Sequence, residues 1–167
     1  MLGLKRQENE VYYVRTMLLS FKADVFQRVL SGEKIYEHRK VFPDEPIEAY
    51  LYVSAPVKAI KGIMHLNNKT AIESWKKKYS YDTDALHRID EYLQHHKFAM
   101  EISDFQNTNG IRLEKLREDI PGFVVPQMYY FIDDSNLLDY LKVNLRAEGK
   151  MIVHHFDDVP SNQICKL

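Results

Sequence analysis

The stretch SGEKIYEHRK, residues 31–40, decides how this sequence is interpreted. It joins a glycine turn to a dense group of charged and aromatic side chains. Gly32 follows an apolar pattern of helical spacing, and glycine suits the left-handed residue just past a helix end. Because side chains alternate along a strand, Glu37 and Arg39 would share one face of a strand after the turn. The sequence therefore predicts an ion pair between these two residues.

That pair has a chemistry of its own. A glutamate held against an arginine stays ionised and orients the guanidinium, whose planar fork matches phosphate oxygens or the edge of a base. Lys34, just beyond the turn, adds a point charge. We therefore expect residues 31–40 to contribute to a polar binding site.

The segments on either side of this stretch predict short strands and helices. Residues 17–21 form an apolar run typical of a buried strand, and the apolar residues in 25–30 recur at helical spacing. After the charged stretch, residues 48–53 and 59–66 predict two strands joined by a turn at 54–56. The chain thus opens with a strand and a helix, and a strand meander follows.

In the second half of the chain, the spacing of the apolar residues changes twice. Residues 67–97 show helical spacing after a cap at Asp82 or Thr83, which predicts a helical insertion. Residues 98–105 alternate as a half-buried strand does, Gly110 is expected to break that strand, and residues 111–116 are expected to resume it. A strand at 129–132 and a helix capped by Ser135 come next, with Leu137, Leu138, Leu141 and Leu145 on its apolar face. Beyond a short strand at 151–153, the last dozen residues look loosely ordered.

The order of these features resembles the ASCH family, a branch of the PUA-like superfamily. The family signature is Gly-x-Lys-x-x-Glu-x-Arg after a strand and a helix, and Gly32, Lys34, Glu37 and Arg39 match all four positions. Residues 52–56 and the pair at 126–127 before a tyrosine-rich strand also fit. The expected fold class is α+β: a small PUA-like β-barrel decorated by helices, with the insertion near 67–97. We expect an N-terminal extension at 1–16, the ASCH/PUA-like domain at 17–153 and a C-terminal tail at 154–167.

The resemblance also implies a function, the binding of RNA or a nucleotide in a polar, partly basic cleft lined by the signature. The expected ligand-binding residues are Lys34, Glu37, Arg39, Tyr36, Ser54, Lys58 and Gln127. Stacking of an unpaired base on an aromatic side chain contributes about 1–3 kcal/mol, and Tyr36, Tyr50 and Tyr52 are the candidates for it. The expected partner is therefore RNA, a nucleotide or a nucleoside.

Two other functions stay open. Small bacterial relatives in the superfamily are amidohydrolases that remove an acyl group from a modified cytidine with a lysine, a threonine and a glutamate. The lysine corresponds to Lys34, but Glu37 stands where the threonine nucleophile would be, so a hydrolase would have to use Lys34 and Glu37 differently. Alternatively, the insertion serves as a surface for a protein partner, whose identity the sequence leaves unknown.

Composition excludes several classes of protein. Lys and Arg number 23 against 24 for Asp and Glu, so any basic surface must be local. The N-terminus lacks the apolar run of a signal peptide, no window resembles a membrane span, and the lone Cys165 suits a reducing compartment, so a cytoplasmic protein is expected. The adjacent pairs His95-His96 and His154-His155 point apart and have no acidic partner at a ligand spacing. We expect neither a metal site nor a cofactor.

Overall fold

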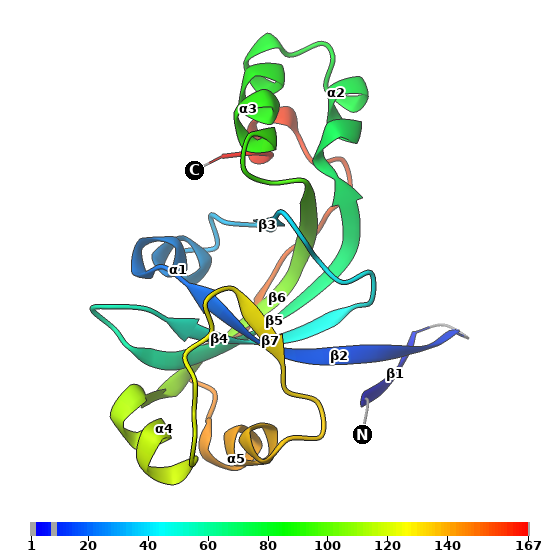
Figure 1. The fold of residues 1–167 in the computed structure, drawn as a ribbon. Helices are drawn as coiled ribbons and strands as arrows, with labels where there is room; N and C mark the ends of the chain where they lie inside the picture. Colours follow the sequence, from blue (N-terminus) through cyan, green and yellow to red (C-terminus); the bar gives the residue numbers. More distant parts are fainter. Residues whose placement is uncertain (1–2, 8–9, 167) are drawn as a thin grey trace.

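The computed structural model describes residues 3–7 and 10–166, and within them a strongly curved sheet of eight strands forms the centre of the molecule (Figure 1). The strands are β1 (Gly3–Gln7), β2 (Glu10–Phe21), β3 (Tyr36–Arg39), β4 (Ile47–Val53), β5 (Ala59–Ala71), β6 (Phe98–Arg112), β7 (Tyr129–Phe131) and β8 (Ile152–Val153). The helices are α1 (Ala23–Leu30), α2 (Trp75–Lys78), α3 (Thr83–Leu93), α4 (Leu113–Asp119) and α5 (Asn136–Asn144), with short 3-10 turns η1 (Ile72–Ser74) and η2 (Ser161–Gln163).

The sheet follows the order β1-β2-β4-β5-β6-β3, with β7 beside β2 and β8 beside β6. The strands β2 and β4 are parallel, and the other pairs are antiparallel. The sheet curls into a partly open barrel with helices packed around it, so the predicted α+β class, a β-barrel decorated by helices, is confirmed. None of the helices described is long and apolar enough to cross a membrane.

Both faces of the sheet are buried, which explains why residues 17–21 read as a continuous apolar run. Met17, Leu19 and Phe21 point into the barrel, where they pack against Phe26 and Val29 of α1. Leu18 points outward into a second cluster that contains the leucines of α4 and α5. Figure 1 shows α4 and α5 together on one side of the sheet and α1 on the other.

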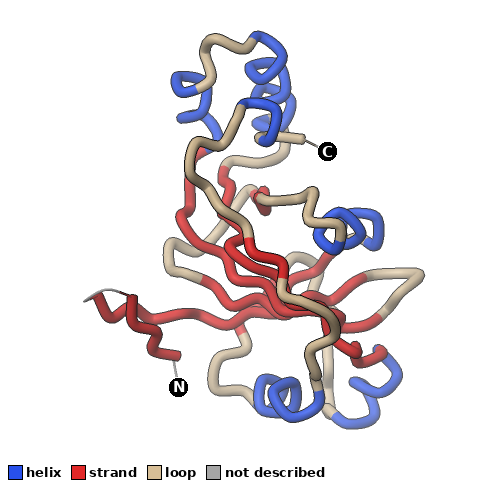
Figure 2. The backbone as a smooth tube through the Cα atoms, turned by 180° about the vertical axis from the view of Figure 1, so that it is seen from behind, coloured by secondary structure: helices blue, strands red, loops and turns tan. Residues whose placement is uncertain are grey.

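A third cluster fills a lobe at the far end of β5 and β6, which carry α2 and α3 between them (Figure 1). Trp75, Tyr79 and Ile89 form its centre together with Val159 and Ile164 of the C-terminal segment. In Figure 2 the chain returns along the strands to this lobe, where it ends. The tyrosine hydroxyl of Tyr79 donates to the backbone oxygen of Val159 at 2.8 Å. The last residues are thus packed and not loosely ordered as expected, because scattered apolar side chains without a period are buried here.

The predicted strand at 111–116 is wrong in its second half. The strand β6 continues through Gly110, whose φ of +83° lets residues 108–110 bulge opposite Lys61, and its pairing resumes at Ile111 opposite Ile60. The residues after Arg112 form helix α4. A short apolar run does not distinguish strand from helix, and here Leu113 and Leu116 point to the same side because they are one helical turn apart.

Two expected boundaries also lie elsewhere. Strand β2 begins at Glu10, inside the segment expected to be an N-terminal extension, and β1 pairs with it. Strand β5 continues to Ala71, so the helical part of the insertion begins only at Ile72. The predicted helix cap at Ser135 is confirmed, because its hydroxyl accepts from the backbone N–H of Leu138 at 3.1 Å. The alternative Asp82 caps α3 in the same way through Ala85.

Candidate functional site

The turn at Gly32 sets the position of the charged stretch. Gly32 has a φ of +77°, as expected for the residue after a helix end, and its N–H donates to the backbone oxygen of Val29. The N–H of Lys34 then donates to the backbone oxygen of Arg28 at 3.0 Å. These bonds fold the chain back over the end of α1 and direct it into β3.

The predicted pair between Glu37 and Arg39 forms the centre of the site. Nε of Arg39 donates to Oε1 of Glu37 at 2.8 Å, and Nζ of Lys34 lies 3.5 Å from the other carboxylate oxygen. Glu37 is only 5% exposed, so these two cations compensate for the loss of water around its carboxylate. Nη2 of Arg39 also donates to the backbone oxygen of Ser20 at 2.9 Å, which links β3 to the end of β2.

These residues border a cleft of about 860 Å³. Its walls come from the end of β2, the end of α1, β3, the turn after β4, the loop before β7, and the end of α3. Five of the expected ligand-binding residues line it: Lys34, Glu37, Arg39, Ser54 and Gln127. Residues that are far apart in sequence therefore meet at one hollow, which is large enough for a small organic ligand.

Tyr36 and Lys58 are not brought into this cleft. Tyr36 is 8% exposed and packs against Trp75 and Phe156 in the lobe, where burial raises the pKa of its phenol. Lys58 is exposed but is not among the residues that line the cleft. Tyr50 and Tyr52 belong to the outer core cluster and are each 3% exposed, so neither ring is open for stacking.

The lobe supplies residues that the sequence did not predict. His38 on β3 packs against Tyr92 and His96 from the end of α3. His95 also lines the cleft, as does Lys166 of the C-terminal segment. The alternation along 34–40 places His38 away from Glu37, but it gives no indication of which element His38 faces. The missing information was the long-range packing of the insertion against β3.

The cleft is positively charged overall. Five lysine or arginine side chains and three glutamates line it: Lys22, Arg28, Lys34, Arg39 and Lys166 against Glu33, Glu37 and Glu91. Burial lowers the pKa of His38 well below its usual value, and the nearby Lys34 contributes to this. Burial also lowers the pKa of His96. Both imidazoles are therefore neutral at pH 7, and the net charge favours an anionic ligand.

Two polar atoms in this wall have no hydrogen-bond partner among the described residues. Oε2 of Glu37 and Nε2 of His38 are buried and accept or donate no hydrogen bond there, although Lys34 lies near the former. Buried polar atoms are almost always hydrogen-bonded in folded proteins. Glu37 and His38 both line the cleft, so these two atoms belong to its wall.

Solved structures identify the fold. The ASCH protein from Zymomonas mobilis superposes with a TM-score of 0.61 at 19% identity, covering 79% of this chain and 96% of that one. The chain has the ASCH fold. Two variants of the same Zymomonas mobilis protein, each with one substitution, match at TM-scores of 0.60 and 0.58 with 18% and 19% identity, covering 79% and 77% of this chain and 99% and 96% of theirs. No protein-family model and no curated protein sequence matches the chain.

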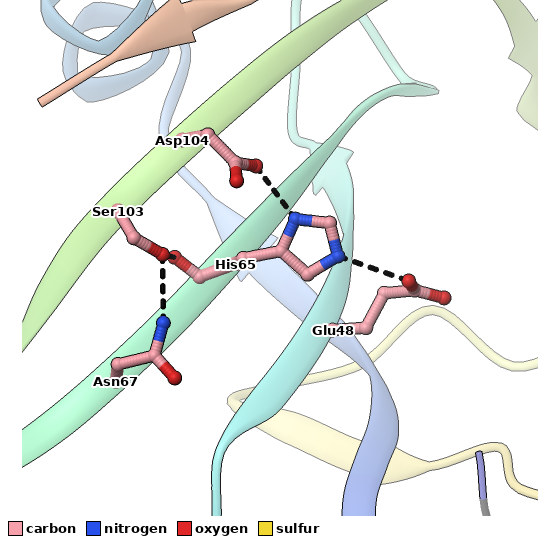
Figure 3. A network of polar contacts seen from close by, with 5 residues as sticks. All are labelled: Glu48, His65, Asn67, Ser103 and Asp104. Carbon is pink, nitrogen blue, oxygen red and sulfur yellow. Dashed lines mark hydrogen bonds and ion pairs between the residues drawn. The ribbon is translucent and has the colours of Figure 1, made fainter. Parts of the chain in front are cut away.

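A second polar cluster lies on the same ASCH barrel, outside the cleft (Figure 3). The imidazole of His65 on β5 lies between two carboxylates, with Nδ1 2.6 Å from Asp104 on β6 and Nε2 3.0 Å from Glu48 on β4. Below it, the Asn67 amide donates to the Ser103 hydroxyl, which donates to the backbone oxygen of His65. Among the described residues, no group of three His, Cys, Asp or Glu side chains is arranged so that it could hold a metal ion.

Proposed function

We propose that the cleft binds single-stranded RNA or a nucleotide. The observation that carries this proposal is the convergence of Lys34, Glu37 and Arg39 on a cleft of about 860 Å³ whose lining is net positive. Glu37 holds the guanidinium of Arg39 in a fixed plane, which suits bidentate contact with a phosphate or a base edge.

The lining also offers different groups to the different parts of a nucleotide. Lys22 at the start of α1 and Arg28 in its last turn both line the cleft, where they would neutralise a phosphate. Ser54 and Gln127 lie on the barrel side and can donate or accept hydrogen bonds from a base edge or a ribose hydroxyl. A net charge near zero for the whole chain and a positive cleft favour a local site over a broad nucleic-acid surface.

No observation supports the hydrolase alternative as strongly as the positively charged cleft supports binding. Hydroxyl nucleophiles are activated by a neighbouring base. Ser20 and Ser54 line the cleft, but no hydrogen bond from either hydroxyl to a histidine, lysine or carboxylate is found among the residues described. The carboxylate of Glu37 is already held by Arg39 and Lys34.

The test is a fluorescence anisotropy titration of a labelled single-stranded RNA 12-mer at several salt concentrations. We expect Lys34→Gln and Arg28→Gln each to weaken binding, and to flatten the slope of log affinity against log salt by about 0.7 for each lost phosphate contact. The matched control is Lys142→Gln, which removes the same charge from an exposed position on α5, outside the cleft. The proposal would be refuted if the protein did not bind the RNA, or if the affinity changed neither with salt nor in Lys34→Gln.

A further inference from the structure

The helical lobe forms one wall of the cleft. Helix α3 ends at Leu93, and the N–H groups of His95 and His96 both donate to the backbone oxygen of Tyr92, at 3.1 and 2.8 Å. This tight turn places the side chains of Tyr92, His95 and His96 along the cleft, opposite the barrel. The insertion therefore faces the same hollow as the signature residues.

Three rings in this wall form a contiguous group. The ring centroids of His38 and Tyr92 are 4.7 Å apart with an interplanar angle of 62°, and those of Tyr92 and His96 are 5.7 Å apart at 45°. Tyr92 and His96 are half-buried, so part of each ring stays open, while His38 is buried beside them. These edge-on and tilted contacts hold the orientation of the rings without covering all their faces.

The wall is held in place by the C-terminal segment. Nη2 of Arg88 on α3 donates to the backbone oxygen of Ser161 at 2.7 Å, and the hydroxyl of Ser161 donates to Asp82 at the start of α3. At the base of the lobe, the N–H of Ile72 donates to the backbone oxygen of Lys97 at 3.0 Å. A wall ordered before binding loses less entropy when a ligand arrives, and this favours its use as a binding surface.

The chemistry of the wall fits a flat, electron-rich group. Burial lowers the pKa values of both His38 and His96, so the rings are neutral, and burial raises the pKa of Tyr92 to about 12, so its phenol keeps its proton. The cations Lys34 and Arg39 lie on the neighbouring wall. A planar group that carries a phosphate would place its flat part on the rings and its charge on the cations.

We propose that Tyr92 and His96 form a stacking wall for one unpaired nucleobase of the ligand, so that the helical insertion, and not a strand tyrosine, selects for a base in the cleft. This inference rests on the proposed function and assigns the residues that recognise the base. His38, buried beside these rings, holds Tyr92 in place through the ring contact at 4.7 Å.

The test compares two labelled octamers, oligouridylate and an octamer of the same backbone in which an abasic spacer replaces every base. Removing one stacking ring costs roughly 5- to 150-fold in affinity. We expect Tyr92→Leu to weaken oligouridylate binding within that range and to leave the abasic octamer within twofold. We expect His96→Leu to weaken oligouridylate binding as well. Tyr92→Phe keeps an aromatic ring and should bind oligouridylate as tightly as the wild type does.

Two controls separate this inference from a folding defect and from the proposed function. Tyr81→Leu removes a tyrosine that is 74% exposed on the same lobe and outside the cleft, and it should change neither affinity. If Tyr92→Leu weakens both octamers equally, or neither, while Lys34→Gln weakens both, the stacking wall is refuted and RNA binding stands. If the wild type binds neither octamer, the proposed function itself fails.

Discussion

The two polar clusters on this barrel differ in what brings their side chains together. Glu48, His65 and Asp104 lie directly opposite one another on three adjacent strands, so the register of the sheet alone brings them together (Figure 3). Glu37 and Arg39 instead lie on one edge strand, and Arg39 reaches across to β2, with which β3 has no strand pairing in the part of the chain that the structure describes.

The clusters also differ in burial and in how many of their polar atoms have a partner. The His65 side chain is 19% exposed, those of Glu48 and Asp104 are each 24% exposed, and the two ring nitrogens of His65 both face carboxylates. The Glu37 side chain is 6% exposed and has a buried oxygen without a hydrogen-bond partner among the described atoms, beside an open cleft. The comparison teaches that a polar network set by strand register braces the sheet. A network that links two unpaired strands and leaves a carboxylate oxygen without a hydrogen-bond partner is the better candidate for binding a ligand.

The largest expected effect concerns the two glutamates. Glu37→Gln leaves Lys34 and Arg39 without a compensating charge in a mostly buried place, and breaking such a pair costs about 3 kcal/mol. Glu48→Gln removes a more exposed carboxylate, for which the expected cost is below about 1 kcal/mol. Urea unfolding with linear extrapolation measures both free energies of unfolding. Equal costs for the two variants would remove the energetic difference between the clusters.

The next effect is a pH dependence that belongs to the cleft wall. The pKa of His38 is lowered well below 6.5 by burial, with Lys34 and His96 contributing, so the unfolded chain binds a proton that the folded chain does not. The stability that follows from a neutral His38 is therefore complete above pH 6.5 and is lost as the pH falls below it, by about 1.4 kcal/mol per pH unit.

We expect His38→Phe to reduce the loss of stability between pH 7 and pH 5 by about 2 kcal/mol relative to the wild type. Urea unfolding at several pH values measures it. The control His87→Gln removes an exposed imidazole on α3 and should leave the wild-type slope. An unchanged slope in His38→Phe would mean that His38 takes up its proton in the folded protein as readily as in the unfolded one.

Local sequence patterns predicted the parts of the site that local geometry determines. The glycine turn, the Glu37–Arg39 pair and the caps at Asp82 and Ser135 each depend on residues close together in sequence, where period and stereochemistry are sufficient. Ser54 and Gln127 belong to the two further stretches that fit the family resemblance, 52–56 and 126–127, and the structure brings both residues to the cleft.

The rest depended on packing between distant segments. Tyr36 and Arg39 lie on opposite faces of one strand, and only the position of the lobe shows that the Tyr36 face is closed by Trp75 and Phe156. Tyr92 and His96 lie more than fifty residues from the signature and follow no binding motif. Their role in the wall becomes visible only when the insertion is placed against β3.

The smallest expected effect is on binding at the edge of the cleft. Lys166 lines the cleft from the C-terminal segment and is half-buried, and a solvent-screened contact of this cation with a phosphate contributes about 0.5 kcal/mol. Lys166→Gln should therefore weaken the RNA 12-mer two- to threefold in the anisotropy titration at low salt, and the difference should vanish as salt screens the charge. His65→Gln alters the other cluster and should leave the affinity unchanged at every salt concentration, because no member of that cluster lines the cleft. If His65→Gln weakened RNA binding as much as Lys166→Gln, the ligand would reach beyond the cleft onto the outer sheet, and the division between a bracing cluster and a binding cluster would be wrong.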